Sequence, residues 1–85
     1  LSVSNVLPTN AASIYPNPAT TNLTITVEDA YDVSEIAILD LTGKVVVRGE
    51  TLHTQSLDIS ALENGYYTVR ISTDAGSISQ KLMKL

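Results

Sequence analysis

Few side chains in this sequence could perform chemistry. There is one histidine, His53, and there is no cysteine. A Ser-His-acid arrangement would have to use His53, which lies in the polar stretch 50–54 with no glycine-framed nucleophile elsewhere in the chain. One histidine and scattered carboxylates also do not supply a tetrahedral metal site. We therefore expect a solvated loop histidine, no enzymatic activity, and no metal or other cofactor.

Three acidic residues, Glu28, Asp29 and Asp32, lie close together in the chain. Oxygen-rich loops bind calcium, so a calcium site is one interpretation of this stretch. The spacing of acids that defines an EF-hand loop is absent, however. We therefore favour an ordinary solvated turn.

Two adjacent tyrosines, Tyr66 and Tyr67, could stack against a sugar ring. Neighbouring residues of a strand point to opposite faces of the sheet, so only one of the two can be exposed. The alternation with Val69 and Ile71 predicts that Tyr67 is buried and Tyr66 exposed. A single exposed tyrosine gives little support to a sugar site.

The charge distribution argues against nucleic-acid binding. The 85 residues have a net charge of −4, and residues 1–43 contain five acids but no Lys or Arg. The five basic residues are spread over residues 44–85, so they do not form the basic patch that a nucleic-acid binder needs. No apolar run approaches the roughly 20 residues that span a bilayer. No signal peptide opens the sequence, which fits a cytoplasmic domain or a fragment of a longer exported protein.

The hydrophobic pattern predicts a small all-β domain. Apolar and polar residues alternate over residues 23–27 and again over residues 67–72, as in half-buried strands. Two further β-rich runs meet at Gly43, which predicts a hairpin. Only residues 60–65 show a trace of helical pattern, and they are too few for more than one turn. These patterns predict six or seven short strands, and so an antiparallel β-sandwich or barrel.

Two segments frame the start of this domain. Residues 1–13 are rich in Ser, Asn and Ala and show no sustained period, so they are predicted to be a linker, with the sandwich occupying residues 14–85. Pro16 and Pro18 fix two φ angles, and Asn17 between them is biased towards extended geometry. This stretch is therefore predicted to be a rigid, extended approach to a sheet edge.

Five motifs occur in the same order as in a known family. They are Tyr15-Pro16-Asn17-Pro18; Asn22 to Ile25; Ile38 to Val46 with Asp40 and Gly43; Leu57 to Ile71 with Gly65 and Tyr67; and Lys81-Leu82-Met83-Lys84-Leu85. Each motif alone is common, but the ordered set is specific. The sequence resembles, over about residues 13–85, the type A C-terminal sorting domain of the type IX secretion system of Bacteroidetes. Tyr66 departs from the family pattern, which more often has a small or aliphatic residue there.

The resemblance implies an immunoglobulin-like β-sandwich that follows the N-terminal domains of a larger cargo protein. In this family the domain travels with its cargo through the periplasm and is recognised by an outer-membrane translocon. A sortase-like protease then removes it. The cargo is released outside the cell or joined to an anionic lipopolysaccharide at the outer-membrane surface.

The resemblance also assigns roles to particular residues. Residues 81–85 become the segment that the translocon recognises, although lysines on an edge strand also prevent unwanted pairing, and both roles are compatible. Gly65 is expected to need a positive φ or close packing, and Tyr67 to lie in the core. Cleavage is expected within residues 1–13 or just before Leu1. An exposed last strand would also allow a homodimer.

Two other interpretations of a small sandwich stay open. A carbohydrate-binding or adhesive immunoglobulin-like module would need a strip of exposed aromatic residues. An inert spacer would tolerate loss of its last residues wherever the fold survived. Fold alone does not separate these from a sorting domain.

Overall fold

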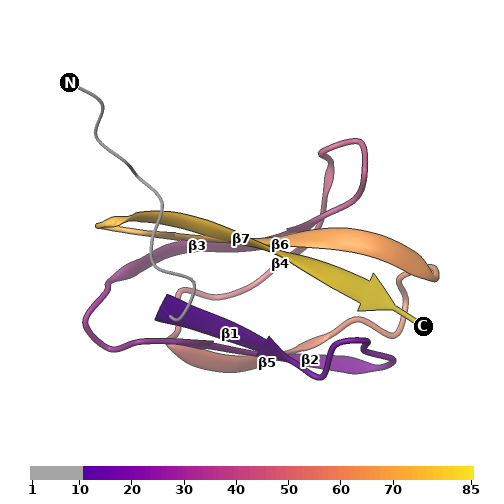
Figure 1. Ribbon diagram of the computed structural model, residues 1–85, viewed down its shortest axis with the longest axis horizontal. Helices are drawn as coiled ribbons and strands as arrows, with labels where there is room; N and C mark the ends of the chain where they lie inside the picture. The colour runs from indigo at the N-terminus through magenta and orange to yellow at the C-terminus, as the bar shows by residue number, and fades with distance from the viewer. Residues whose placement is uncertain (1–10) are drawn as a thin grey trace.

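A computed structural model describes residues 11–85 and confirms an immunoglobulin-like β-sandwich (Figure 1). Seven strands form two antiparallel sheets, and the described residues contain no α-helix. The strands are β1 (Ala12–Tyr15), β2 (Asn22–Val27), β3 (Val33–Leu39), β4 (Val45–Arg48), β5 (Thr54–Asp58), β6 (Gly65–Thr73) and β7 (Gly76–Lys84). The expected linker 1–13 lies mostly outside the described residues, but Ala12 and Ser13 belong to β1, and Ala11 and Ala12 are buried.

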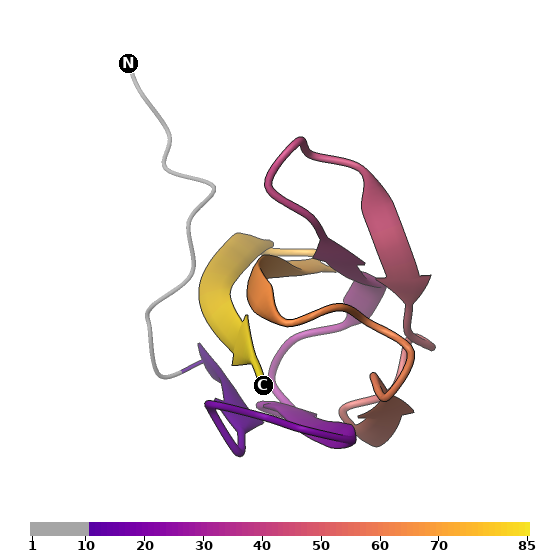
Figure 2. The same cartoon turned by 90° about the vertical axis from the view of Figure 1, so that its right-hand side faces the viewer.

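The strand order brings the first and last strands together. One sheet has the order β1-β2-β5 and the other β4-β3-β6-β7, so β1 and β7 are each at a sheet edge. Figure 2 shows β7, in yellow, beside β1, in indigo, on one side of the sandwich. A hydrogen bond from Gln80 Nε2 to the Ala12 carbonyl (3.1 Å) joins the two edges. β1 begins at one end of the sandwich and β7 finishes at the other (Figure 1).

The core follows from the alternation in the sequence. In β2 the inward residues Leu23, Ile25 and Val27 are buried, while the threonines between them are only partly buried. The facing sheet contributes Ile36 and Ile38 of β3, with further apolar side chains from β6 and β7. Apart from Tyr67, the core is made of aliphatic side chains, which pack by burial of apolar area alone.

The structure corrects one local expectation, for residues 16–20, and confirms another, for the single turn near residue 60. Residues 16–20 form bends and one isolated bridge rather than an extended approach, and the Tyr15–Pro16 and Asn17–Pro18 peptide bonds are both cis. Residues 60–62 form a turn, closed by a 3.0 Å hydrogen bond from Leu62 N to the Ile59 carbonyl, and no helical segment follows it.

Two glycines have the positive φ angles that their positions in the sequence predicted. Gly43 has φ +90° in the β3–β4 turn, and Gly65 has φ +146° at the start of β6. Nothing lies within 4 Å of the position that a Cβ would take at Gly65. The requirement for glycine there is therefore conformational and not steric.

We predict that Gly65→Ala lowers the free energy of unfolding by about 1–3 kcal/mol, because an L-residue is strained at this φ. Urea unfolding followed by circular dichroism measures the loss. Gly65→Val is expected to lose at least as much. A Gly65→Ala variant as stable as the parent would contradict the assignment of strain to this position.

Candidate functional site

The last strand presents only part of the segment that the sequence assigned to recognition. Lys81 and Leu85 are exposed and Met83 is half-buried, whereas Leu82 is fully buried and Lys84 is only 5% exposed. Strand alternation explains the pattern, because residues 82 and 84 face the core and residues 81 and 83 face outward. A partner can therefore contact Lys81, Met83 and Leu85 directly, but not Leu82 or Lys84.

Lys84 is a buried lysine with a local partner. It lies opposite Gly65, which has no side chain, and its Nζ donates a hydrogen bond to the Leu85 carbonyl oxygen (2.9 Å). A lysine can bury its aliphatic stem while its charged end reaches a polar partner. The role of an exposed edge lysine, which the sequence suggested for both lysines, is therefore open to Lys81 alone.

The side chain of Asn17 is bound to the outer edge of β7. Its Nδ2 donates to the Lys81 carbonyl (2.8 Å), and its Oδ1 accepts from the Met83 backbone N–H (3.0 Å). A residue of a neighbouring parallel strand would make the same pair of bonds to positions 81 and 83. The amide of Asn17 thus takes the place of one rung of a strand ladder.

The backbone of Ala19 provides the next rung. Its N–H donates to the Met83 carbonyl (2.9 Å), and its carbonyl accepts from the Leu85 N–H (2.8 Å), which gives a parallel bridge to Lys84. Ala19 itself is fully buried. The outer edge of residues 81–85 is therefore paired within the chain, by the connection between β1 and β2. The homodimer expected from an exposed last strand stays a prediction, and it would need another edge or the displacement of this connection.

The family residues Asp40 and Gly43 build the β3–β4 turn. Asp40 Oδ1 accepts hydrogen bonds from Thr42 N (2.9 Å), Thr42 Oγ1 (2.6 Å) and Lys44 N (3.0 Å). These bonds, chiefly the one from the Thr42 hydroxyl, hold the pKa of the Asp40 carboxyl below its ordinary value. Asp40 acts as a turn residue, as Asp commonly does.

Tyr67 and Tyr66 face opposite sides of β6, as the sequence predicted. Tyr67 lies in the core, and its hydroxyl donates to the Glu63 carbonyl (2.7 Å). Tyr66 is exposed, and the Lys81 Nζ lies 4.3 Å from the centre of its ring, a cation–π contact across two neighbouring strands.

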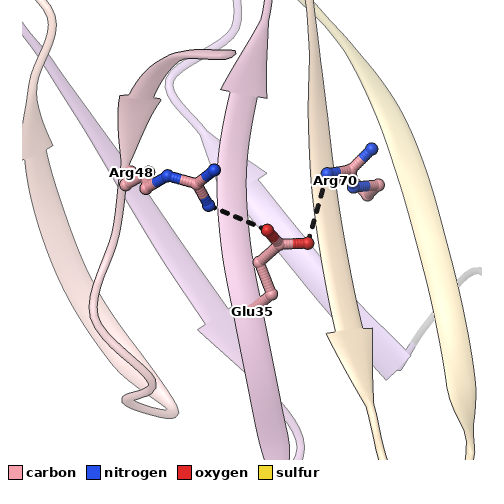
Figure 3. Close-up of polar contacts among 3 residues, drawn as sticks. All are labelled: Glu35, Arg48 and Arg70. Atoms are coloured by element: carbon pink, nitrogen blue, oxygen red, sulfur yellow. Dashed lines mark hydrogen bonds and ion pairs between the residues drawn. The ribbon is translucent and has the colours of Figure 1, made fainter.

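The sequence did not indicate an ion-pair cluster on the outer face of the four-stranded sheet (Figure 3). Glu35 of β3 accepts hydrogen bonds from Arg48 of β4 (2.9 Å) and Arg70 of β6 (3.2 Å). The hydrogen bond from Arg48 is the main cause of a lowered Glu35 pKa. The two arginines are the register partners of Ala37, which is buried although it faces outward. The only sign of this cluster in the sequence is that its three strands carry charges of opposite sign. Which of these charges meet depends on the strand register, which the sequence does not show.

The groups considered for catalysis or metal binding do not assemble. The half-buried His53 contacts the Tyr31 carbonyl through its ring nitrogen, and its own carbonyl accepts from Val27 N (2.6 Å). It is thus a structural contact between loops and not the solvated residue that we expected. Within residues 11–85, no group of three or more His, Asp or Glu side chains could hold a metal ion, and no helix is long and apolar enough to cross a membrane.

The fold and the site define a small β-sandwich in which the motif residues build turns, fill the core or pair the last strand. Residues 13–85 match the family described as the secretion system C-terminal sorting domain. The chain belongs to this family of sorting signals for type IX secretion, which is not described as a family of enzymes. The family implies export towards the cell surface or the extracellular space, attached to a cargo protein. A comparison with curated proteins gives no match.

We predict that Asn17→Ala lowers the free energy of unfolding by about 1–2 kcal/mol, because two hydrogen bonds to β7 are lost and one leaves a backbone donor unpaired. Amide hydrogen exchange is the decisive measurement, since Met83 N–H should exchange faster than in the parent protein. Asn22→Ala, at an exposed position of β2, is the matched control. Unchanged exchange at Met83 would show that Asn17 does not hold this edge.

We also predict that stability falls in acid. The pKa values of Glu35, Asp40 and Asp58 are lowered, in Asp58 chiefly by the Ser60 hydroxyl, so the unfolded chain binds more protons than the folded one as pH falls. The three carboxylates stabilise the folded state fully at pH values above the ordinary carboxyl pKa. This stabilisation decreases from about pH 5 downward, as the pH falls towards and through their lowered pKa values in the folded protein.

Urea unfolding over this pH range measures the effect. Asp40→Ala should make the dependence on pH shallower, whereas Asp29→Ala, at an exposed carboxylate, should change it less. If the free energy of unfolding depended on pH equally in the parent and in the Asp40→Ala variant, the hydrogen bonds of the Asp40 carboxylate in the turn would not be a source of the acid sensitivity.

Proposed function

We propose that the translocon of the type IX system recognises the outward residues of the last strand, Lys81, Met83 and Leu85, in the folded domain. The observation that supports this most directly is the pairing of residues 81–85 with Asn17 and Ala19. The two family motifs that are farthest apart in the sequence thus form one structural unit, and it holds the last strand in a single position.

The manner of recognition follows from which groups are free. The backbone edge of residues 81–85 already has partners, so a translocon strand that added to this edge would first have to displace Asn17 and Ala19. The side chains on the outer face need no such displacement. We therefore propose recognition through side chains on the sheet face.

We further propose that a sortase-like protease separates the domain from its cargo at a bond N-terminal to Ala11. Proteases need an accessible, locally extended chain. Ala11 and Ala12 are buried, and β1 is hydrogen-bonded to β2 from Ala12 onward. A bond within β1 would become accessible only after the first sheet opened. The cargo is then released or joined to lipopolysaccharide.

No specific observation favours the other two functions. The exposed tyrosines of the described chain are Tyr15 and Tyr66, and two aromatic side chains are fewer than the several that a sugar-binding strip needs. An inert spacer would have the same fold as a sorting domain but would not direct export, so an export experiment distinguishes the two.

The test is a reporter with a signal peptide fused to residues 1–85, expressed in a bacterium with a type IX system and in a translocon-deficient strain. We expect translocon-dependent appearance of the reporter outside the cell, with a loss of mass close to that of this domain. A reporter that stays whole in the periplasm of both strains would refute a sorting function.

Substitutions separate recognition from folding. Deleting residues 81–85 would remove the core residue Leu82, so its effect would not identify a contact. Leu82→Ala should cost about 2–5 kcal/mol, of a total of about 4–13 kcal/mol for a chain of this length, and should abolish export by unfolding.

We predict that the double variant Lys81→Glu with Leu85→Ser folds normally but is exported poorly, because both side chains are exposed in the proposed contact. The matched control is Lys44→Glu with Leu52→Ser, at exposed positions away from β7, and it should be exported normally. Circular dichroism confirms folding, and the exported fraction of the reporter is the measurement. Normal export of the β7 variant would exclude these side chains from recognition.

A further inference from the structure

A pocket of about 260 Å³ lies where β3 ends and β6 begins. One wall is the turn of residues 40–42, and the other is formed by residues 63–67. Pockets that enclose small-molecule ligands are usually about 300–1,000 Å³. The volume of this pocket therefore suits one side chain of a partner better than a whole small molecule.

Both walls are held in place by the chain itself. Asp40 fixes the turn through its three hydrogen bonds to Thr42 and Lys44. The Tyr67 hydroxyl holds the Glu63 carbonyl on the opposite wall. A partner thus meets a surface that is already ordered, which lowers the entropic cost of binding.

The lining combines apolar surface with negative charge. Leu41 is 80% exposed and Tyr66 is 42% exposed, so both present apolar surface to a partner at the pocket. Asp40 and Glu63 add two carboxyl groups, and no Lys or Arg lines the pocket. The Asp40 carboxyl is ionised at neutral pH, since its pKa lies below the ordinary aspartate value.

One type of side chain complements this lining. Lysine and arginine carry an apolar stem and a cationic end, which match the apolar walls and the carboxylates respectively. The Lys81 ammonium, 4.3 Å from the centre of the Tyr66 ring, already occupies one face of this ring, so the charge of a partner's side chain is matched by the carboxylates and not by the ring. The net charge of −4 favours a basic partner over the whole molecule.

We infer that this pocket binds a lysine or arginine side chain, flanked by an apolar residue, on a partner protein. The contact differs from the proposed one on residues 81–85, because it involves the β3–β4 turn and the loop before β6. It does not depend on the sorting role, since binding can be measured with the isolated chain.

The test is an NMR titration of residues 1–85 with the peptide acetyl-Gly-Leu-Arg-Leu-Gly-amide. Saturable shifts are expected at the backbone amides of residues 40–42 and 63–67, and added salt should weaken them. The same peptide with citrulline in place of arginine keeps the shape but loses the charge. Equal binding of the citrulline peptide, or shifts only outside the pocket, would overturn the inference.

Variants then identify the pocket. Glu63→Gln should weaken binding by a factor of about two to five, the range for an exposed ion pair. Leu41→Ser should weaken it through lost apolar contact. The matched controls Glu28→Gln and Leu52→Ser, at exposed positions outside the pocket, should bind like the parent. If the Glu63→Gln and Leu41→Ser variants bound the arginine peptide as tightly as these controls, the inferred binding site would also be wrong.

Discussion

The packing of the two sheets against each other depends on the hydrogen bonds that pair the outer edge of β7. An edge strand exposes unpaired backbone donors and acceptors, and these invite association with other chains. Here the Asn17 amide and the Ala19 backbone satisfy that edge from the connection between β1 and β2. Because that connection belongs to the other sheet, the same bonds hold the two sheets together along the side where β1 meets β7.

Strand alternation imposes the second constraint, on which residues a partner can contact. In the last strand it buries Leu82 and Lys84 and leaves Lys81 and Met83 on the outer face. A family motif in this segment therefore contains residues of two kinds, some required for folding and some available for contact. Loss of export after mutation at a buried position reports on the fold, whereas loss at an outward position reports on recognition.

Much of the fold was predictable because short-range patterns determine it. The alternation in β2 and β6 placed Leu23 and Tyr67 in the core, and the glycine at position 43 marked the hairpin. The role of Asn17 was not predictable, because its partners lie 64 and 66 residues away. Lys84 was misjudged for a different reason: its charge suggested exposure, although the alternation that buries Leu82 also directs residue 84 inward.

The positions of the two chain ends have a mechanical consequence. β1 begins at one end of the sandwich and β7 finishes at the opposite end, and the two lie side by side (Figures 1 and 2). A force applied between the start of β1 and the end of β7 would act along the strands. The interstrand hydrogen bonds are then loaded in shear, all together, and not opened one after another. This arrangement of the chain ends therefore favours resistance to unfolding under such a force.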